Sequence, residues 1–268
     1  MMAGKILIGI DASGPSRAAV VWGIDRAGAL GCAVELVHVI DTAQPSSAVG
    51  EQLLEEELSR ARAGAPSVAI SGLLLRGRPP AVLAKHSRGF ELLALGTHKT
   101  GFIFGRTFGS RFVTLAWTAR CPVAFIPDLL GPSRRGIVAA LDGPASATDA
   151  IDFAANEAAR TGGELILLRV LAGPAAEPVA ILRASRAAQA ATEHARLVAR
   201  ATTGRALRVR VRVSERGAAE ALVAASERAA LLVVGRGSAG GAGSFRSLVH
   251  DILVNMASPV VIVPARAR

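Results

Sequence analysis

The chain has 268 residues, 51% of them hydrophobic, and its 31 Lys or Arg against 21 Asp or Glu give a formal net charge of +10. A chain of this length and composition buries most of the surface that its unfolded form exposes. This excludes a disordered protein and one that depends on disulfides or a structural metal. At about 150 residues per domain, the length predicts two domains.

Neither a membrane span nor a nucleic-acid interface is predicted. No uncharged apolar run approaches the roughly 18 to 20 residues that a spanning helix needs, and the apolar run before Asp11 is too short for a signal peptide. The cysteines, Cys32 and Cys121, have the spacing of neither a zinc module nor a disulfide framework. Basic residues are spread over both halves, without Tyr for base stacking, which argues against specific nucleic-acid binding. We expect a cytoplasmic protein.

In the first half, short runs of Val, Ile and Leu alternate with longer stretches of helical period, which is typical of a parallel sheet with crossover helices. The first helix is expected from about Ser16 to Leu30, with Ser13 or Ser16 as its N-cap and Gly31 just past its end. Strands are predicted near 5–10, 33–39, 68–75, 91–95 and 122–126.

The second half repeats the plan of the first. The strand that leads to Asp11 returns before Asp142, and two later segments, Leu92–Gly96 and Cys121–Pro127, return as Leu231–Gly235 and Ser258–Pro264. Strands are predicted near 136–141, 164–170, 206–213, 230–234 and 259–263, with a long helix over Pro178 to Arg200. With Gly131 to Ser133 as the linker, the predicted domains are 1–131 and 132–268.

This pattern predicts the α/β class, with two doubly wound, Rossmann-like parallel five-stranded sheets in tandem. In such sheets ligands bind at the carboxyl ends of the central strands. Asp11 follows the first predicted strand and Gly96 ends the fourth. Both are therefore expected on one rim, together with the loop from Gly96 to Ser110.

That loop has a composition typical of phosphate binding. Its glycines allow close backbone approach, and Ser110 at a helix start adds unpaired amides that favour an anion. Lys99, Arg106 and Arg111 supply positive charge. The same residues also fit a surface loop in which the glycines form turns and Ser110 only caps its helix.

Nearly the whole chain resembles the universal stress proteins, in the tandem form with two such domains. Members of the ATP-binding branch have Gly, two residues, Gly, nine residues, then Gly and Ser or Thr. Gly96 and Gly109-Ser110 keep that spacing, and Lys99 stands at the place of the second glycine. The other segments that carry the resemblance are Ile6 to Asp11 with Ser13, Val37 to Val39, Gly77 to Pro80, and Cys121 to Pro127.

The resemblance implies an adenine nucleotide alpha hydrolase-like fold and a site for ATP or AMP, with Mg²⁺ accompanying ATP. Adenine and ribose would lie against residues near the ends of the first two strands, and the phosphates against the loop. The implied residues are Ile10, Asp11, Ala12, Val39, Gly96, His98, Lys99, Gly109, Ser110 and Arg111. The Lys99 Cβ would crowd the phosphates, or its ammonium would pair with them.

The second copy departs further from this pattern. Its loop after Gly235 is shorter, Ser238 stands at the second glycine's place, and Arg246 precedes Ser247, the expected counterpart of Ser110. We expect a degenerate nucleotide site in this half. Asp142 is then a strand-end or helix-cap residue.

None of the common phosphate-handling enzyme motifs is present in the sequence. It has no P-loop signature, no GxGxxG opening the first helix and no kinase signature set. Asp11 is the acid near the loop that could hold Mg²⁺, so enzyme activity stays uncertain, with a weak ATPase at most. The histidines outside the loop have no Ser or Cys partner at interpretable spacing and are expected to be structural; they are His38, His86, His194 and His250.

Two kinds of edge strand are expected. One expected edge strand carries three arginines that alternate with apolar residues, Arg208, Arg210 and Arg212. The favoured interpretation is that these charges discourage pairing with another strand edge. The less favoured alternative is that they form a patch for an anion or a nucleic acid. The apolar last strands, Val123–Ile126 and Val260–Val263, are expected at the other edge of each half. Their pairing would give an intramolecular pseudo-dimer, which could dimerise again.

Together these observations predict a cytoplasmic regulatory module of the stress response whose first half binds ATP or AMP. One alternative is a nucleotide-free scaffold or partner-binding protein in which Lys99 closes the site. Another is a slow ATPase that uses Asp11 and Mg²⁺.

Overall fold

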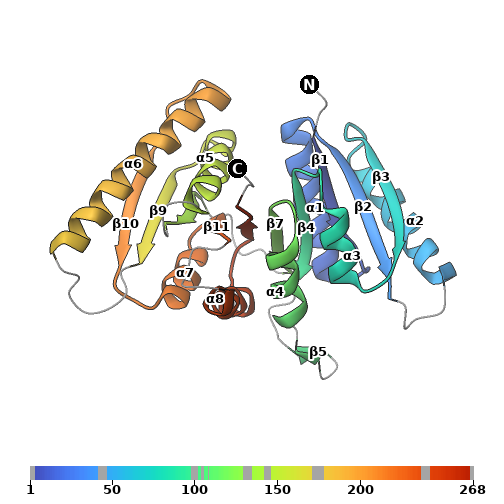
Figure 1. Ribbon diagram of the computed structural model, residues 1–268. Coiled ribbons are helices and arrows are strands. Elements are labelled where there is room, and N and C mark those ends of the chain that lie inside the picture. Colours follow the sequence, from blue (N-terminus) through green and yellow to red (C-terminus); the bar gives the residue numbers. More distant parts are fainter. Residues whose placement is uncertain are drawn as a thin grey trace. The chain divides into compact units, whose positions relative to one another are not determined.

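The computed structural model describes residues 4–41, 47–97, 102–103, 106–107, 109–128, 135–141, 146–170, 178–236 and 242–265. The chain separates into two compact units, Met1–Leu129 and Leu130–Arg268. Both units alternate strands and helices (Figure 1). The expected linker, Gly131 to Ser133, lies outside the described residues.

In the described part of the first unit, five parallel strands lie in the order β3-β2-β1-β4-β7. Their bounds are β1 Lys5–Gly9, β2 Ala33–Ile40, β3 Ile70–Arg76, β4 Leu92–Thr97 and β7 Val123–Pro127. The connecting helices are α1 Gly14–Leu30, α2 Ser47–Gly64, α3 Pro79–His86 and α4 Gly109–Thr118. This confirms the predicted fold class, and β7 is the last strand of its own unit.

Helices cover both faces of this sheet, which is why its strands read as continuous apolar runs. α1 packs on β1 and β4 and α2 on β2 and β3, while α3 and α4 pack together on the opposite face. Ile6, Leu7 and Ile8 of β1 are fully buried, so the central strand is in contact with both helical layers.

The boundaries of α1 follow from its capping residues. Ser13 is the N-cap, and its Oγ accepts a hydrogen bond from the N–H of Ser16 at 3.2 Å. Gly31 ends the helix in the left-handed conformation, with φ of 64°. The helix therefore begins at Gly14, two residues before the predicted start at Ser16.

The Gly-rich loop of the first unit contains a feature that the sequence did not predict. Two short strands, β5 (Phe102–Ile103) and β6 (Arg106–Thr107), pair antiparallel in its middle. The loop from Gly96 to Ser110 is therefore divided by a small hairpin.

In the described part of the second unit, five parallel strands repeat this arrangement in the order β10-β9-β8-β11-β12. Their bounds are β8 Ile137–Ala140, β9 Leu165–Val170, β10 Val209–Ser214, β11 Leu231–Gly235 and β12 Val260–Val263. The helices are α5 Ser146–Thr161, α6 Pro178–Thr203, α7 Ala218–Ser226 and α8 Ala242–Asn255. The edge position predicted for the arginine-bearing strand β10 is confirmed.

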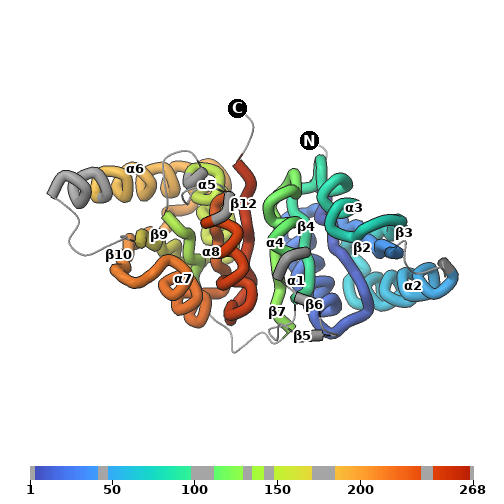
Figure 2. The backbone as a smooth tube through the Cα atoms, turned by 60° about the horizontal axis from the view of Figure 1, so that its bottom comes forward, coloured from blue at the N-terminus to red at the C-terminus, as the bar shows by residue number. Residues whose placement is uncertain are grey.

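The long helix α6 lies mainly against α5 (Figure 2). His194 Nε2 of α6 lies 2.5 Å from Asp152 Oδ1 of α5, and Thr202 Oγ1 donates to Asn156 Oδ1 at 2.5 Å. In the first unit, by contrast, α2 packs on the sheet. None of the helices in the described parts of the chain is both long and apolar enough to cross a membrane.

A buried serine makes the same contacts in both units. The Oγ of Ser87, after α3, donates to Ala84 O at 2.8 Å and accepts from the N–H of Arg120 at 2.9 Å. In the second unit the Oγ of Ser226 donates to Val223 O at 2.7 Å and accepts from Ala257 N–H at 3.1 Å. Each serine thus fixes the chain just before the last strand of its unit.

We predict that Ser87→Ala destabilises the first unit by about 1–3 kcal/mol, because the partly buried backbone N–H of Arg120 loses its acceptor. Both tryptophans, Trp22 and Trp117, lie in the first unit and the chain has no Tyr, so urea unfolding followed by intrinsic fluorescence reports on this unit. The exposed Ser59 of α2 is the control, because Ser59→Ala removes a hydroxyl that is not buried. Equal midpoints for both variants would contradict the prediction.

Candidate functional site

The order of strands in the first unit determines where the ligand-binding edge of a doubly wound sheet lies. The chain moves from β1 outward to β2 and β3, and then returns to the other side of β1 as β4. Loops that leave β1 and β4 therefore diverge, and the carboxyl edge between such strands is where doubly wound sheets bind ligands. Asp11 follows β1 and Gly96 lies in β4, so the structure brings these two predicted site residues to the same edge.

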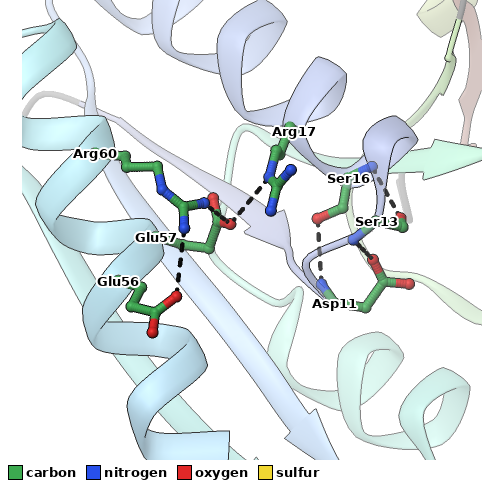
Figure 3. Close-up of polar contacts among 7 residues, drawn as sticks. All are labelled: Asp11, Ser13, Ser16, Arg17, Glu56, Glu57 and Arg60. Atoms are coloured by element: carbon green, nitrogen blue, oxygen red, sulfur yellow. Dashed lines mark hydrogen bonds and ion pairs between the residues drawn. The ribbon is translucent and has the colours of Figure 1, made fainter.

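The turn between β1 and α1 is closed by its own hydrogen bonds (Figure 3). Asp11 Oδ1 accepts from the N–H of Ser13 at 3.0 Å, and Ser16 Oγ accepts from the N–H of Asp11 at 3.2 Å. Ser13 Oγ in turn accepts from Ser16 N–H. Two serines and one carboxylate thus hold the turn in a single conformation.

This arrangement fixes the Asp11 side chain while leaving it exposed. One carboxylate oxygen is held by Ser13, and among the described residues Oδ2 has no hydrogen-bond partner. An ionised carboxylate accepts hydrogen bonds only. Oδ2 can therefore accept from a ligand hydroxyl without any rearrangement of the turn.

Ala12, next to Asp11, has a φ of 62°. Among the described residues it is the one residue other than glycine with a positive φ. A left-handed conformation costs an alanine roughly 1–2 kcal/mol, so the surrounding hydrogen bonds must hold it there. In this conformation the N–H of Ser13 donates to the Asp11 carboxylate.

Two further predicted residues lie at the ends of neighbouring strands, Ile10 just after β1 and Val39 in β2. Ile10 is buried, and its N–H donates to Val37 O at 2.9 Å while its carbonyl lies 2.8 Å from His38 Nδ1. Val39 of β2 is half-buried. Ile10 therefore belongs to the core, and Val39 has apolar surface left at the carboxyl edge. His38 has the structural role expected from the sequence.

Gly96 has a structural role that the sequence analysis missed. A Cβ at this position would overlap the backbone carbonyl of Pro15 and the backbone nitrogen of Ser16. The end of β4 and the first turn of α1 are in direct backbone contact, which only glycine permits. The lack of a side chain at Gly96 thus serves helix packing, whether or not a phosphate also approaches.

The rest of the predicted phosphate site is described only in part. Gly109, Ser110 and Arg111 form the first turn of α4, whose unpaired amides and dipole favour an anion. His98 and Lys99 lie outside the described residues. In the hairpin within the loop, Phe102 pairs with Thr107.

A buried carboxylate that is ion-paired with two exposed arginines lies beside the turn and was not foreseen from the sequence. Glu57 of α2, with a side chain only 5% exposed, accepts from Arg17 Nε of α1 at 3.3 Å and from Arg60 Nη1 at 2.5 Å. A buried carboxylate requires such partners. Since Arg17 follows Ser16, this pair ties α2 to the first turn of α1 (Figure 3).

The second unit differs at the corresponding edge. Helix α8 begins at Ala242, so Ser247 lies within the helix rather than in its first turn, where Ser110 lies in α4. Amides this far inside a helix bond to the preceding turn and cannot hold an anion. Asp142 and Ser238 lie outside the described residues.

The described ranges contain no group of three or more His, Cys, Asp or Glu residues placed to hold a metal ion. Burial raises the pKa of the Cys121 thiol to about 12, so this cysteine is protonated and unreactive at neutral pH.

The family model of the universal stress protein family matches residues 2–127 and again residues 133–264. A universal stress protein of Mycobacterium tuberculosis is 33% identical over 126 residues, which cover 44% of this chain and 46% of the relative. Another from that organism is 27% identical over 194 residues, 61% of each chain. The chain thus spans about half to three fifths of these curated relatives.

Among solved structures, a universal stress protein from Archaeoglobus fulgidus is similar over 98% of this chain and 96% of that chain. The TM-score is 0.75 at 18% sequence identity. This likeness concerns the fold, and it extends over both units. The resemblance read from the sequence is confirmed by the two matches of the family model.

We predict that Gly96→Ala destabilises the first unit by about 1–3 kcal/mol, because the added methyl pushes α1 away from β4. Gly14, the first residue of α1, is the matched control, since a Cβ there meets nothing within 4 Å. Gly14→Ala should leave the unit at least as stable. Tryptophan fluorescence in urea measures both variants, and an unchanged midpoint for Gly96→Ala would refute the close contact.

Proposed function

This chain belongs to the universal stress protein family, and we propose that its first unit binds an adenine nucleotide, ATP or AMP, at the carboxyl edge of β1 and β4. The observation that carries the proposal is the Asp11 carboxylate, exposed at the topological switch point with one oxygen fixed and the other without a partner among the described residues. A ribose hydroxyl is a suitable donor to that oxygen.

The other residues then have the following roles. Adenine and ribose lie near Val39 and Ala12, over the end of β2 and the turn, with Ile10 supporting them from below. The phosphates lie toward the loop that follows Gly96 and toward the first turn of α4, where Gly109, Ser110 and Arg111 are found. His98 and Lys99 complete this set. Mg²⁺ would arrive with ATP, because the described residues offer no ready-made metal site.

The proposed role is regulatory binding in the stress response of the cytoplasm. Asp11 is the carboxylate at the edge and already accepts a hydrogen bond from Ser13, so we assign no catalytic residue and propose a weak ATPase at most. Pairing of the apolar last strands within the chain and a further homodimer remain predictions from the sequence. Native mass spectrometry counts the chains and shows whether nucleotide accompanies them.

Calorimetric titration of the full chain with ATP and with AMP tests the proposal. Asp11→Asn should weaken binding about tenfold or more, because a hydrogen bond to a charged acceptor contributes roughly 1.5–3 kcal/mol. Asp25→Asn, on the exposed side of α1, carries the same change of charge and should bind like the wild type. No heat from the wild type at millimolar nucleotide would refute the proposal.

A nucleotide-free scaffold is the second candidate, and the contact of Gly96 with α1 favours it, because that glycine is accounted for without a phosphate. The two candidates differ in the effect of Lys99→Gly. If Lys99 closes the site, nucleotide affinity appears only in the variant. If its ammonium pairs with the phosphates, the wild type binds and the variant binds several-fold more weakly, as the same titration would measure.

A further inference from the structure

The edge strand β10 of the second unit is exposed along most of its length. Residues 210–213 are all exposed, and the apolar side chains of Val211 and Val213 are 40% and 60% exposed. The strand alternates these valines with Arg208, Arg210 and Arg212. Since side chains of a strand alternate between faces, one face of β10 is basic and the other apolar.

The equivalent strand of the first unit, β3, is covered. A Cβ at Gly72 would clash with the side chain of Leu58, because α2 lies directly on the strand. Arg62 of α2 also donates two hydrogen bonds to Ile70 O, each at 3.1 Å. In the second unit α6 packs mainly on α5 (Figure 2). Residues 210–213 of β10 are left exposed.

The backbone of β10 can accept another strand. Leu165 N–H of β9 donates to Arg208 O at 2.9 Å, so the polar groups of Arg208, Arg210 and Arg212 point toward β9. Those of the intervening valines, Val209 to Val213, point away from it. β10 is the last strand in the described sheet order of its unit, so this row of donors and acceptors has no neighbouring strand there.

The arginines determine what kind of strand fits. Arg210 Nε lies 2.5 Å from Glu164 Oε1, which shows that this row of arginines can hold a carboxylate, and Arg208 and Arg212 have no ion pair with any described residue. Two copies of β10 placed edge to edge would oppose arginine to arginine, which is unfavourable. A second copy of this chain is therefore excluded by charge.

We propose that β10 binds an extended acidic segment of a partner protein by strand addition. Backbone hydrogen bonds to Val209, Val211 and Val213 would supply affinity, as in other cases of β-augmentation. Alternate acidic residues would meet Arg208 and Arg212, and the apolar residues between them would cover the valines. The partner segment is thus one in which acidic and apolar residues alternate.

A fluorescein-labelled nonapeptide of alternating Glu and Val, titrated with the full chain and followed by anisotropy, tests this proposal. Arg208→Ser combined with Arg212→Ser should weaken binding roughly tenfold, because two ion pairs are lost. Arg88→Ser combined with Arg120→Ser removes the same charge from exposed sites in the first unit and should leave affinity unchanged.

Val211→Pro tests the backbone contact separately. Its N–H points away from β9, so the ladder within the sheet keeps its bonds while the added strand loses a donor. Binding should fall at least tenfold with an unchanged far-ultraviolet circular dichroism spectrum. If the variant misfolds, a peptide N-methylated at alternate residues removes the partner's donors instead, and it should bind the wild type equally weakly.

Four results would overturn the proposal. The first is no binding of the alternating peptide at millimolar protein. The second is equal binding of a block peptide of the same composition, because register would then be irrelevant. The third is an equal loss of peptide affinity in both double-arginine variants. The fourth is displacement of the peptide by single-stranded DNA of the same charge, combined with no effect of Val211→Pro on peptide binding. Such displacement would indicate a general anion surface.

Discussion

The first unit depends on the backbone contact between Gly96 at the end of β4 and the first turn of α1. Because no side chain separates Pro15 from β4, α1 begins directly beside the carboxyl edge of the sheet, and the turn that carries Asp11 has little room. The turn meets this constraint with three hydrogen bonds and one strained alanine. The buried Glu57 then holds α2 to the same helical turn through Arg17. The packing of α1 on β4 and the geometry of the candidate site are therefore both consequences of the close approach of Gly96 to α1.

Much of the fold could be predicted because its strands are continuous apolar runs between helices of regular period. Strands β1 and β9 begin or end within a residue or two of the prediction, and the strand order follows from how such units wind. Capping signals placed α1 nearly correctly, because Ser13, one of the two predicted N-caps, and Gly31 are its capping residues, although the helix begins two residues before the predicted start. The hairpin of β5 and β6 was missed because two-residue strands have no periodicity to detect.

The candidate site was harder to predict, because its determinants are contacts between distant segments. The spacing of Asp11, Ser13 and Ser16 identified a helix start, but their mutual hydrogen bonds depend on the conformation of Ala12. The glycine pattern around Gly96 suggested phosphate binding, and periodicity alone does not show that α1 occupies the space above it. Glu57 had no sequence signal, because an acidic residue in an acidic helix is expected to face solvent.

The two units also show how one plan diverges. Ser87 and Ser226 make the same hydrogen bonds in the two units. By contrast, α6 lies on α5 and β10 is exposed, and α8 begins about a turn before the position at which α4 starts.

The turn between β1 and α1 in the first unit is held by its own hydrogen bonds. Since Asp11 and its neighbours are already ordered without a ligand, occupation of this edge would freeze few additional torsions. The turn would therefore contribute little to the entropic cost of binding at this edge.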